Sequence, residues 1–170
     1  VWIKNNKDRE KLKNDVALLL EKATARDWLG DNKAPVILKP NLVVSKPAAE
    51  GATTTPAIAE GLIKWLAAYG FSNVNIAEGS WVGDSTAKAF DVCGYTALAQ
   101  KYNIPLIDLQ KDSSVVRETA FGELKICQTV ARLEEQGGSL INLPLLKGHG
   151  QARMTCALKN LKGCIPNSEK

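Results

Sequence analysis

The sequence has 170 residues, of which 45% are hydrophobic and 24% charged, proportions that are typical of a globular chain and exclude disorder. No run of about 18 apolar residues is long enough to span a membrane. The formal net charge is +4. The excess lies in residues 145–170, which hold Lys147, Arg153, Lys159, Lys162 and Lys170 against Glu169 alone. This excess of positive charge indicates either a local anion site or a solvated basic tail. The segment lacks a long basic stripe with interleaved aromatic residues, so nucleic-acid binding is disfavoured.

The first half of the chain predicts strands that alternate with amphipathic helices. Thr55 followed by Pro56 indicates the N-cap and first position of the second helix, and Gly70 is suited to end it. In chain order we expect a strand at residues 1–3, a helix at 8–25, a strand at 36–38, a helix at 56–70 and a strand at 73–77.

The second half continues this alternation and adds a β-hairpin. Asp84 or Ser85 is expected to cap its first helix. Phe121-Gly122 predicts the turn of a hairpin between residues 115–120 and 123–130. In chain order we expect helices at 87–92 and 96–102, a strand at 104–109, the hairpin, a strand at 139–143 and a helix at 153–162.

Strands that alternate with helices predict the α/β class. We expect a mostly parallel, Rossmann-like sheet with flanking helices and an inserted β-hairpin. Residues 1–170 are interpreted as a single α/β domain. Because no closing element follows Ile165-Pro166, we expect this domain to be a truncated portion of a longer one.

Polar residues follow the expected strands at the carboxyl edge of the sheet, where open α/β sheets bind ligands. The expected catalytic residues are His149 as the proton-transfer group, Glu78 as its acidic counterpart, and Lys147. Gly148 permits close approach of a phosphate to the backbone. Thr155 and Lys159 are four residues apart and would share one helix face. The expected ligand-binding residues are Lys39, Asn41, Thr54, Thr55, Gly148, Thr155, Lys159 and Asn160.

Several of these residues also have a purely structural interpretation. Thr55 is favoured as a simple helix cap, and Lys39 is equally well explained as a solvated residue where Pro40 ends a strand. Glu78 equally suits the end of a strand. Trp81, close to Glu78 in the sequence, is a candidate for lining a pocket.

The four cysteines form no C-x-x-C pair, so their spacing predicts neither a zinc ribbon nor an iron–sulfur motif. Cys93 and Cys127 are expected to be small buried apolar residues. Cys156 and Cys164 lie in the basic C-terminal region and are the candidates for reactivity or metal ligation.

The order of these motifs resembles the domain of unknown function 362 family. The motifs that carry the resemblance are Lys39-Pro40-Asn41, Thr54-Thr55-Pro56, Ala77-Glu78-Gly79, residues 142–149 and residues 155–163. Members of that family are often described as iron–sulfur-associated because many carry an appended ferredoxin-like segment. The resemblance implies an iron–sulfur cluster in family members and a ferredoxin-like domain or partner, although this chain contains no cluster motif. A weaker similarity to the nickel-pincer lactate racemases rests on Lys147 and His149 and carries no nickel cofactor over.

Three functions follow from these observations. The first is binding of a small phosphate- or carboxylate-bearing ligand or cofactor at the carboxyl edge of the sheet, with proton transfer by His149 and Lys147. The second is an iron–sulfur-associated redox or electron-transfer accessory module. The third is docking of the basic end on an acidic protein. We expect no nucleic-acid partner, no membrane partner and a cytoplasmic location, and we leave enzymatic activity open.

Overall fold

Four parallel strands form the central sheet, in the order β3-β2-β1-β6. The structure, a computed structural model, describes residues 8–170, and the strand expected at residues 1–3 lies outside them. The strands are β1 (Val36–Pro40), β2 (Val74–Glu78), β3 (Leu106–Asp108) and β6 (Ser139–Leu143). Because β2 and β6 pair with opposite edges of β1, the strand order reverses there. Such a switch point is where open α/β sheets form a ligand-binding crevice.

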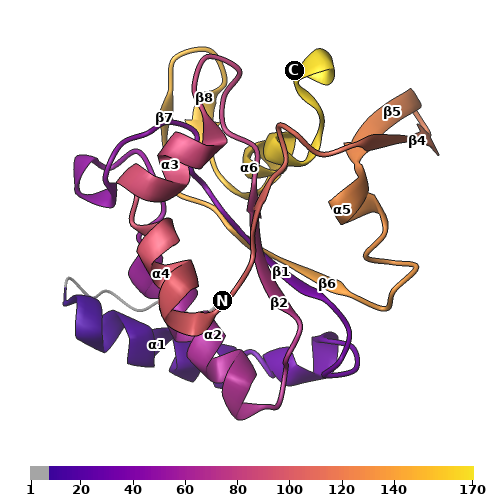
Figure 1. Cartoon of the computed structure of the whole chain (residues 1–170). Coiled ribbons are helices and arrows are strands. Elements are labelled where there is room, and N and C mark those ends of the chain that lie inside the picture. Colours follow the sequence, from indigo (N-terminus) through magenta and orange to yellow (C-terminus); the bar gives the residue numbers. More distant parts are fainter. Residues whose placement is uncertain (1–7) are drawn as a thin grey trace.

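Four helices cover one face of this sheet, as Figure 1 shows. Asp8 caps the first of them and Ser85 caps the third, each with a side-chain oxygen that accepts a backbone N–H. Thr55 occupies the N-cap position of the second helix, as expected, but its side chain forms no capping hydrogen bond. The helices are α1 (Arg9–Lys22), α2 (Pro56–Ala68), α3 (Thr86–Val92) and α4 (Tyr95–Tyr102).

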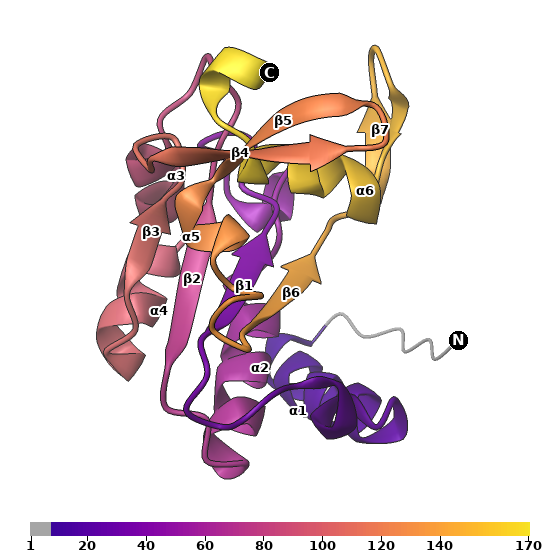
Figure 2. The same ribbon diagram turned by 90° about the vertical axis from the view of Figure 1, so that its right-hand side faces the viewer.

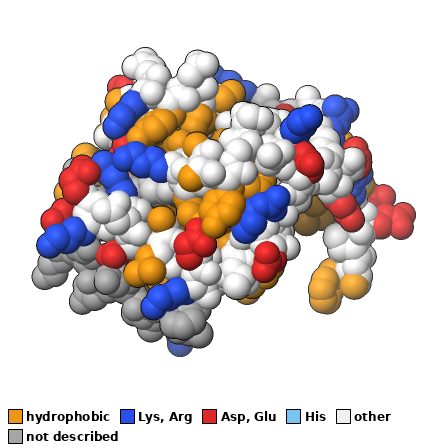
Figure 3. Space-filling model, turned by 90° about the horizontal axis from the view of Figure 1, so that it is seen from below, with side chains coloured by type: hydrophobic (Ala, Val, Ile, Leu, Met, Phe, Trp, Pro, Cys, Tyr) orange, Lys and Arg blue, Asp and Glu red, His pale blue; other side chains and the backbone are white. Residues whose placement is uncertain are grey.

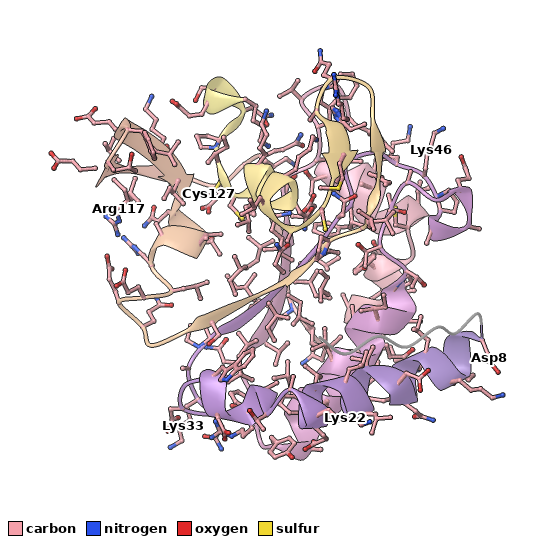
Figure 4. The ribbon with its side chains drawn as sticks, turned by 180° about the vertical axis from the view of Figure 1, so that it is seen from behind. Asp8, Lys22, Lys33, Lys46, Arg117 and Cys127 are labelled. Carbon is pink, nitrogen blue, oxygen red and sulfur yellow. The ribbon has the colours of Figure 1, made fainter. Side chains whose placement is uncertain are left out.

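The inserted β-hairpin is confirmed, although its second strand is shorter than expected. β4 (Ser114–Thr119) pairs with β5 (Gly122–Cys127) in antiparallel register. The chain then turns into α5 (Gln128–Ala131) instead of extending the strand to residue 130. Arg117 on β4 forms an ion pair of 2.9 Å with Glu135 beyond α5 and so fastens the hairpin to the following segment (Figure 4).

A second hairpin stands where the sequence predicts the start of a helix. β7 (Lys147–His149) pairs with β8 (Arg153–Thr155), so the helix expected at residues 153–162 is wrong in its first part. The helical part is α6 (Ala157–Asn160). The turn is stabilised by His149, whose Nδ1 accepts the backbone N–H of residues 151 and 152. Thr155 therefore lies on a strand and does not share a helix face with Lys159.

Short 3₁₀ helices complete the chain, and both hairpins gather with its C-terminal segment at one end of the sheet. The 3₁₀ helices are η1 (Ala25–Trp28), η2 (Ala48–Glu50), η3 (Leu161–Cys164) and η4 (Asn167–Glu169). Figure 2 shows the hairpins, α6 and the C-terminus above the arrowheads of β1 and β6. This end is the carboxyl edge of the sheet. The residues that follow the strands lie there, as expected from the sequence.

The two faces of the sheet are packed unequally. The larger apolar cluster lies between the sheet and helices α1 to α4 and includes the buried residues Trp65, Leu66 and Tyr95. The opposite face carries a smaller cluster around Ile37 and Cys127, next to α5 and β5. Burying one large apolar side chain stabilises a fold by about 1.5–3 kcal/mol. The face with the four helices therefore contributes most of the hydrophobic stabilisation. Cys93 and Cys127 are buried, as expected.

The end of the molecule away from the carboxyl edge carries charges of both signs. Figure 3 shows Lys and Arg side chains scattered among Asp and Glu side chains on this surface. None of the helices within residues 8–170 is both long enough and apolar enough to cross a bilayer.

Candidate functional site

The ends of β1 and β2 are joined by a buried ion pair. The ammonium of Lys39 bonds to Oε2 of Glu78, and the two side chains are 0% and 3% exposed. Oε1 of Glu78 accepts the backbone N–H of Leu42 at 3.3 Å. These contacts neutralise both charges inside the protein, where an unpaired charge is costly. The expected acidic residue is thus present at the carboxyl edge, but it is already paired.

Three asparagine side chains connect the strand ends to the C-terminal segment. Nδ2 of Asn41 donates to Oδ1 of Asn160 at 2.8 Å. Nδ2 of Asn160 donates to Oδ1 of Asn142 at 2.7 Å and to the carbonyl of Pro40 at 3.3 Å. Asn41 and Asn160 are buried, and buried polar groups of this kind are normally hydrogen-bonded. The network holds α6 against β1 and β6.

Lys147 belongs to this network. Its ammonium donates to Oδ1 of Asn41 at 2.9 Å and to the backbone carbonyl of Ala52. Burial lowers the pKa of Lys147, the charge of Lys159 acts in the same direction, and the charge of Glu78 opposes both. Lys147 ties β7 to the loop before α2 and does not line the pocket described below.

The three threonines among the expected site residues have different surroundings. The Thr54 hydroxyl accepts the backbone N–H of Asn41 at 3.0 Å and donates to the carbonyl of Leu143 at 2.8 Å, so it bridges β1 and β6. Thr55 begins α2. Thr155 is 2% exposed, and its hydroxyl has no hydrogen-bond partner among residues 8–170. None of the three lines the pocket.

A pocket of about 410 Å³ lies at the carboxyl edge of the sheet. It contains five of the expected site residues, namely Asn41, Glu78, His149, Lys159 and Asn160. The other expected residues lie outside its lining, namely Lys39, Thr54, Thr55, Lys147, Gly148 and Thr155. The remaining lining residues are Val43, Gly79, Ser80, Trp81, Val82, Gln151, Ala152, Met154, Lys162, Gly163 and Lys170.

The pocket is positively charged. Lys159, Lys162 and Lys170 line it, and none of them forms an ion pair with another residue in the range 8–170. Burial lowers the pKa of Lys159, and the charge of Lys162 lowers it further. Burial also lowers the pKa of Lys170, against the opposing charge of Glu78. Glu78 is the acidic side chain among the described residues that line the pocket, and its ion-pair partner is Lys39, so the three lysines have no carboxylate of their own there.

His149 is held in one orientation. Its Nδ1 accepts the backbone N–H groups of Gln151 at 3.2 Å and Ala152 at 3.0 Å. A neutral imidazole that accepts at Nδ1 carries its proton on Nε2. All three residues line the pocket, so the ring nitrogen that remains for a ligand is a hydrogen-bond donor in the neutral state.

Two glycines that were not predicted as site residues let the C-terminal segment pack close to the end of β2. A Cβ on Gly79 would lie 2.5 Å from the carbonyl oxygen of Gly163. A Cβ on Gly163 would lie 2.8 Å from the ammonium of Lys39. Lys170 also reaches this point, where Nζ donates to the carbonyls of Gly79 and Ser80 at 3.4 Å. Only tertiary folding brings Gly163 and Lys170 next to Gly79. The one indication of this site in the sequence was the position of Gly79 directly after a strand.

The cysteines do not fit an iron–sulfur cluster. Cys164 is buried, and burial raises the pKa of its thiol to about 11, which disfavours the thiolate that ligates iron. Cys156 is half-buried at the start of α6. Within the described part of the chain, no three side chains of His, Cys, Asp or Glu are grouped so that they could hold a metal ion.

The comparisons with known proteins agree with the resemblance seen in the motifs. Over 140 residues the chain is 29% identical to "Thylakoid-associated protein sll1697" from Synechocystis sp.. The match covers 79% of this chain and 40% of that protein. The chain thus spans less than half the length of that relative. No solved structure matches this chain. Residues 36–170, from β1 to the last residue, match the family described as "Domain of unknown function (DUF362)". The chain therefore belongs to the DUF362 family.

Proposed function

We propose that this domain binds a small phosphate- or carboxylate-bearing ligand or cofactor in the pocket at the carboxyl edge of its sheet. The observation that carries the proposal is the group of three lysines, Lys159, Lys162 and Lys170, around a pocket whose one acidic side chain is already paired. Unpaired cations in a partly enclosed site repel one another and lower one another's pKa, as Lys162 does to Lys159. A bound anion removes this repulsion.

Proton transfer by His149 is part of the proposal. The histidine lines the pocket with Nδ1 occupied by two backbone N–H groups. A ligand would therefore meet Nε2. Glu78 is held by Lys39 and contributes by fixing the edge of the pocket, and Lys147 contributes by holding Asn41. This assignment leaves His149 as the expected catalytic residue whose side chain faces the pocket without an ion-pair partner among residues 8–170.

No contact among the described residues favours an iron–sulfur accessory module over this proposal. The Synechocystis relative is named for its association with thylakoids, and a cytoplasmic location for this chain stays a prediction.

Native mass spectrometry together with calorimetric titration tests the proposal. The protein is purified without added phosphate and titrated with inorganic phosphate and with citrate, and the mass spectrum reports any anion or metal retained from the cell. We expect binding that weakens at least tenfold in the double variant Lys159→Ala/Lys162→Ala. Lys33→Ala is the matched control, because Lys33 is exposed and lies away from the pocket (Figure 4).

Two results would overturn the proposal. One is a wild-type protein that binds neither anion and retains none from the cell. The other is equal loss of binding in the Lys33→Ala control and in the double variant, since that would reflect general surface charge instead of the pocket.

A further inference from the structure

The pocket has an apolar side opposite in character to its lysines. Trp81, Val82 and Met154 line it and are 57%, 52% and 58% exposed. Val43 and Ala152 extend this side. An inorganic anion would contact only the cations and N–H groups of the pocket. The apolar side chains would then stay exposed to water. Ligand pockets combine apolar walls with a few polar groups because the ligand itself has both kinds of surface.

Trp81 is fixed in place within this apolar side. Its backbone N–H donates to the carbonyl of Val43 at 3.1 Å, and its carbonyl accepts from the backbone N–H of Asp84 at 2.9 Å and from Nε2 of Gln110 at 3.2 Å. A Cβ on Gly83 would collide with three carbons of the indole ring, so the Gly83 backbone packs directly against the ring. An exposed tryptophan that is held in this way loses little conformational entropy when a ligand contacts it.

We infer that the ligand is an aromatic anion, a planar ring that carries a phosphate or carboxylate group. The ring contacts Trp81, and the charged group lies among Lys159, Lys162 and Lys170. Two flat ring systems in contact gain more than their buried area alone provides. A pocket of about 410 Å³ is also large enough for a ring and its anionic group, since small-molecule sites start at about 300 Å³. This inference rests on the proposed function and specifies its substrate class.

Three phosphates that share one charged group separate the contributions of charge, apolar surface and flatness. Inorganic phosphate carries the charge alone, cyclohexyl phosphate adds an apolar body, and phenyl phosphate adds a flat aromatic ring of similar size. Binding of each phosphate to the wild type and to the variants is measured by calorimetric titration, and NMR of the indole N–H signals reports contact with Trp81 in the wild type. The signal of Trp81 is identified by its absence in Trp81→Phe.

We expect phenyl phosphate to bind roughly three- to tenfold more tightly than cyclohexyl phosphate, a ratio typical of aromatic contacts. Trp81→Ala removes this advantage and leaves the affinity for inorganic phosphate unchanged. Trp28→Ala is the matched control, because Trp28 is 76% exposed and does not line the pocket. Since Trp81 is also largely exposed, its replacement leaves the fold intact, and the indole signals of the other tryptophans verify this.

The outcomes separate failure of this inference from failure of the proposed function. Equal affinity for phenyl and cyclohexyl phosphate overturns the aromatic assignment and leaves the anion site in place. An advantage for phenyl phosphate that survives in Trp81→Ala also overturns it. If none of the three phosphates binds, this inference is overturned, and the proposed function fails as well when citrate does not bind and no anion is retained from the cell.

Discussion

Lys39 and Glu78 form an ion pair across the ends of β1 and β2 with almost no access to solvent. Moving two charges out of water costs several kcal/mol for each ion, and their mutual attraction with additional hydrogen bonds offsets this cost. The additional bonds are present, since Oε1 of Glu78 accepts the Leu42 N–H and Lys39 donates to the Pro40 carbonyl at 3.3 Å. Because Glu78 also lines the pocket, the pair links the core of the sheet to the site.

Removing one member of this pair is expected to be more harmful than removing both. Lys39→Met leaves a buried carboxylate without its partner, and such changes cost about 3–5 kcal/mol of unfolding free energy. The double variant Lys39→Met/Glu78→Leu removes the orphaned charge and should recover part of that loss. Urea denaturation of the single and double variants measures the difference. A double variant whose loss equals the sum of the two single losses would contradict the coupling.

Two of the buried threonine hydroxyls, those of Thr54 and Thr155, predict different effects of the same substitution. Thr54→Val removes a hydroxyl that bonds both Asn41 and Leu143, and we expect a loss of about 1–3 kcal/mol because two partners lose their bonds. Thr155→Val removes a buried hydroxyl without a hydrogen-bond partner in the described part of the chain, so we expect no loss or a small gain in stability. Thermal unfolding of the two variants side by side checks this. A comparable destabilisation in both would show that the Thr155 hydroxyl has a partner.

Glu60 on α2 predicts a pH-dependent contribution to stability. Burial acts to raise the pKa of Glu60, but hydrogen bonds from Lys101, Lys13 and Tyr102 outweigh it and lower the pKa to about 2 from its usual 4.5. Because the folded-state pKa is lowered, the carboxylate stabilises the fold above pH 4.5, and this contribution is lost as the pH falls toward 2. Glu60→Gln should therefore cost about 1–3 kcal/mol at pH 7 and progressively less in acid.

The control for this prediction is Glu50→Gln. Glu50 pairs with Lys46 at 3.5 Å, and both side chains are more than half exposed, so solvent screens the pair. Denaturant titrations at pH 7, 4 and 3 should show a difference that shrinks with falling pH for Glu60→Gln and none for Glu50→Gln. The same loss at every pH for Glu60→Gln would mean that the charge of Glu60 is not the stabilising feature.

Anion binding is expected to weaken at alkaline pH, earlier than an ordinary lysine would predict. Burial and the charge of Lys162 lower the pKa of Lys159, so its ammonium loses its proton below the usual 10.5. Phosphate titrations at a series of pH values from 7 to 11 measure the midpoint of this loss. Lys162→Ala weakens binding but should move the midpoint to higher pH, because it removes the charge that repels the Lys159 proton. An affinity that begins to fall only above pH 10.5 would contradict this prediction.

The strands and helices with strong local signals were predictable from the sequence. The Val36-Ile37-Leu38 run becomes the fully buried β1, and Thr55-Pro56 begins α2 as expected. The second hairpin was not predictable in the same way. Its strands have three residues each, too few to establish an alternating pattern, and Arg153 adopts a left-handed backbone with φ of 58°.

The candidate site was predictable where a residue follows a strand and, for Lys159 and Asn160, from the polar C-terminal motif. Asn41, Glu78 and His149 follow expected strands, and the pocket contains all three. Lys39 and Lys147 come from the same reasoning, but their side chains are directed to internal partners, an ion pair and an amide oxygen. Lys170 was missed as a site residue because only tertiary folding brings the last residue back to the end of β2.

The contact between Gly79 and Gly163 holds the C-terminal segment on the sheet, and the free energy for opening this contact differs from that for unfolding the whole domain. All three lysines belong to the segment that packs there, whereas Glu78 belongs to the sheet. Local opening of that segment would dismantle the cationic side while the four strands stay paired. A bound anion adds its binding free energy to the closed form alone. Occupancy of the pocket should therefore slow hydrogen exchange of the backbone amides after Thr155 and leave the exchange of β1 unchanged.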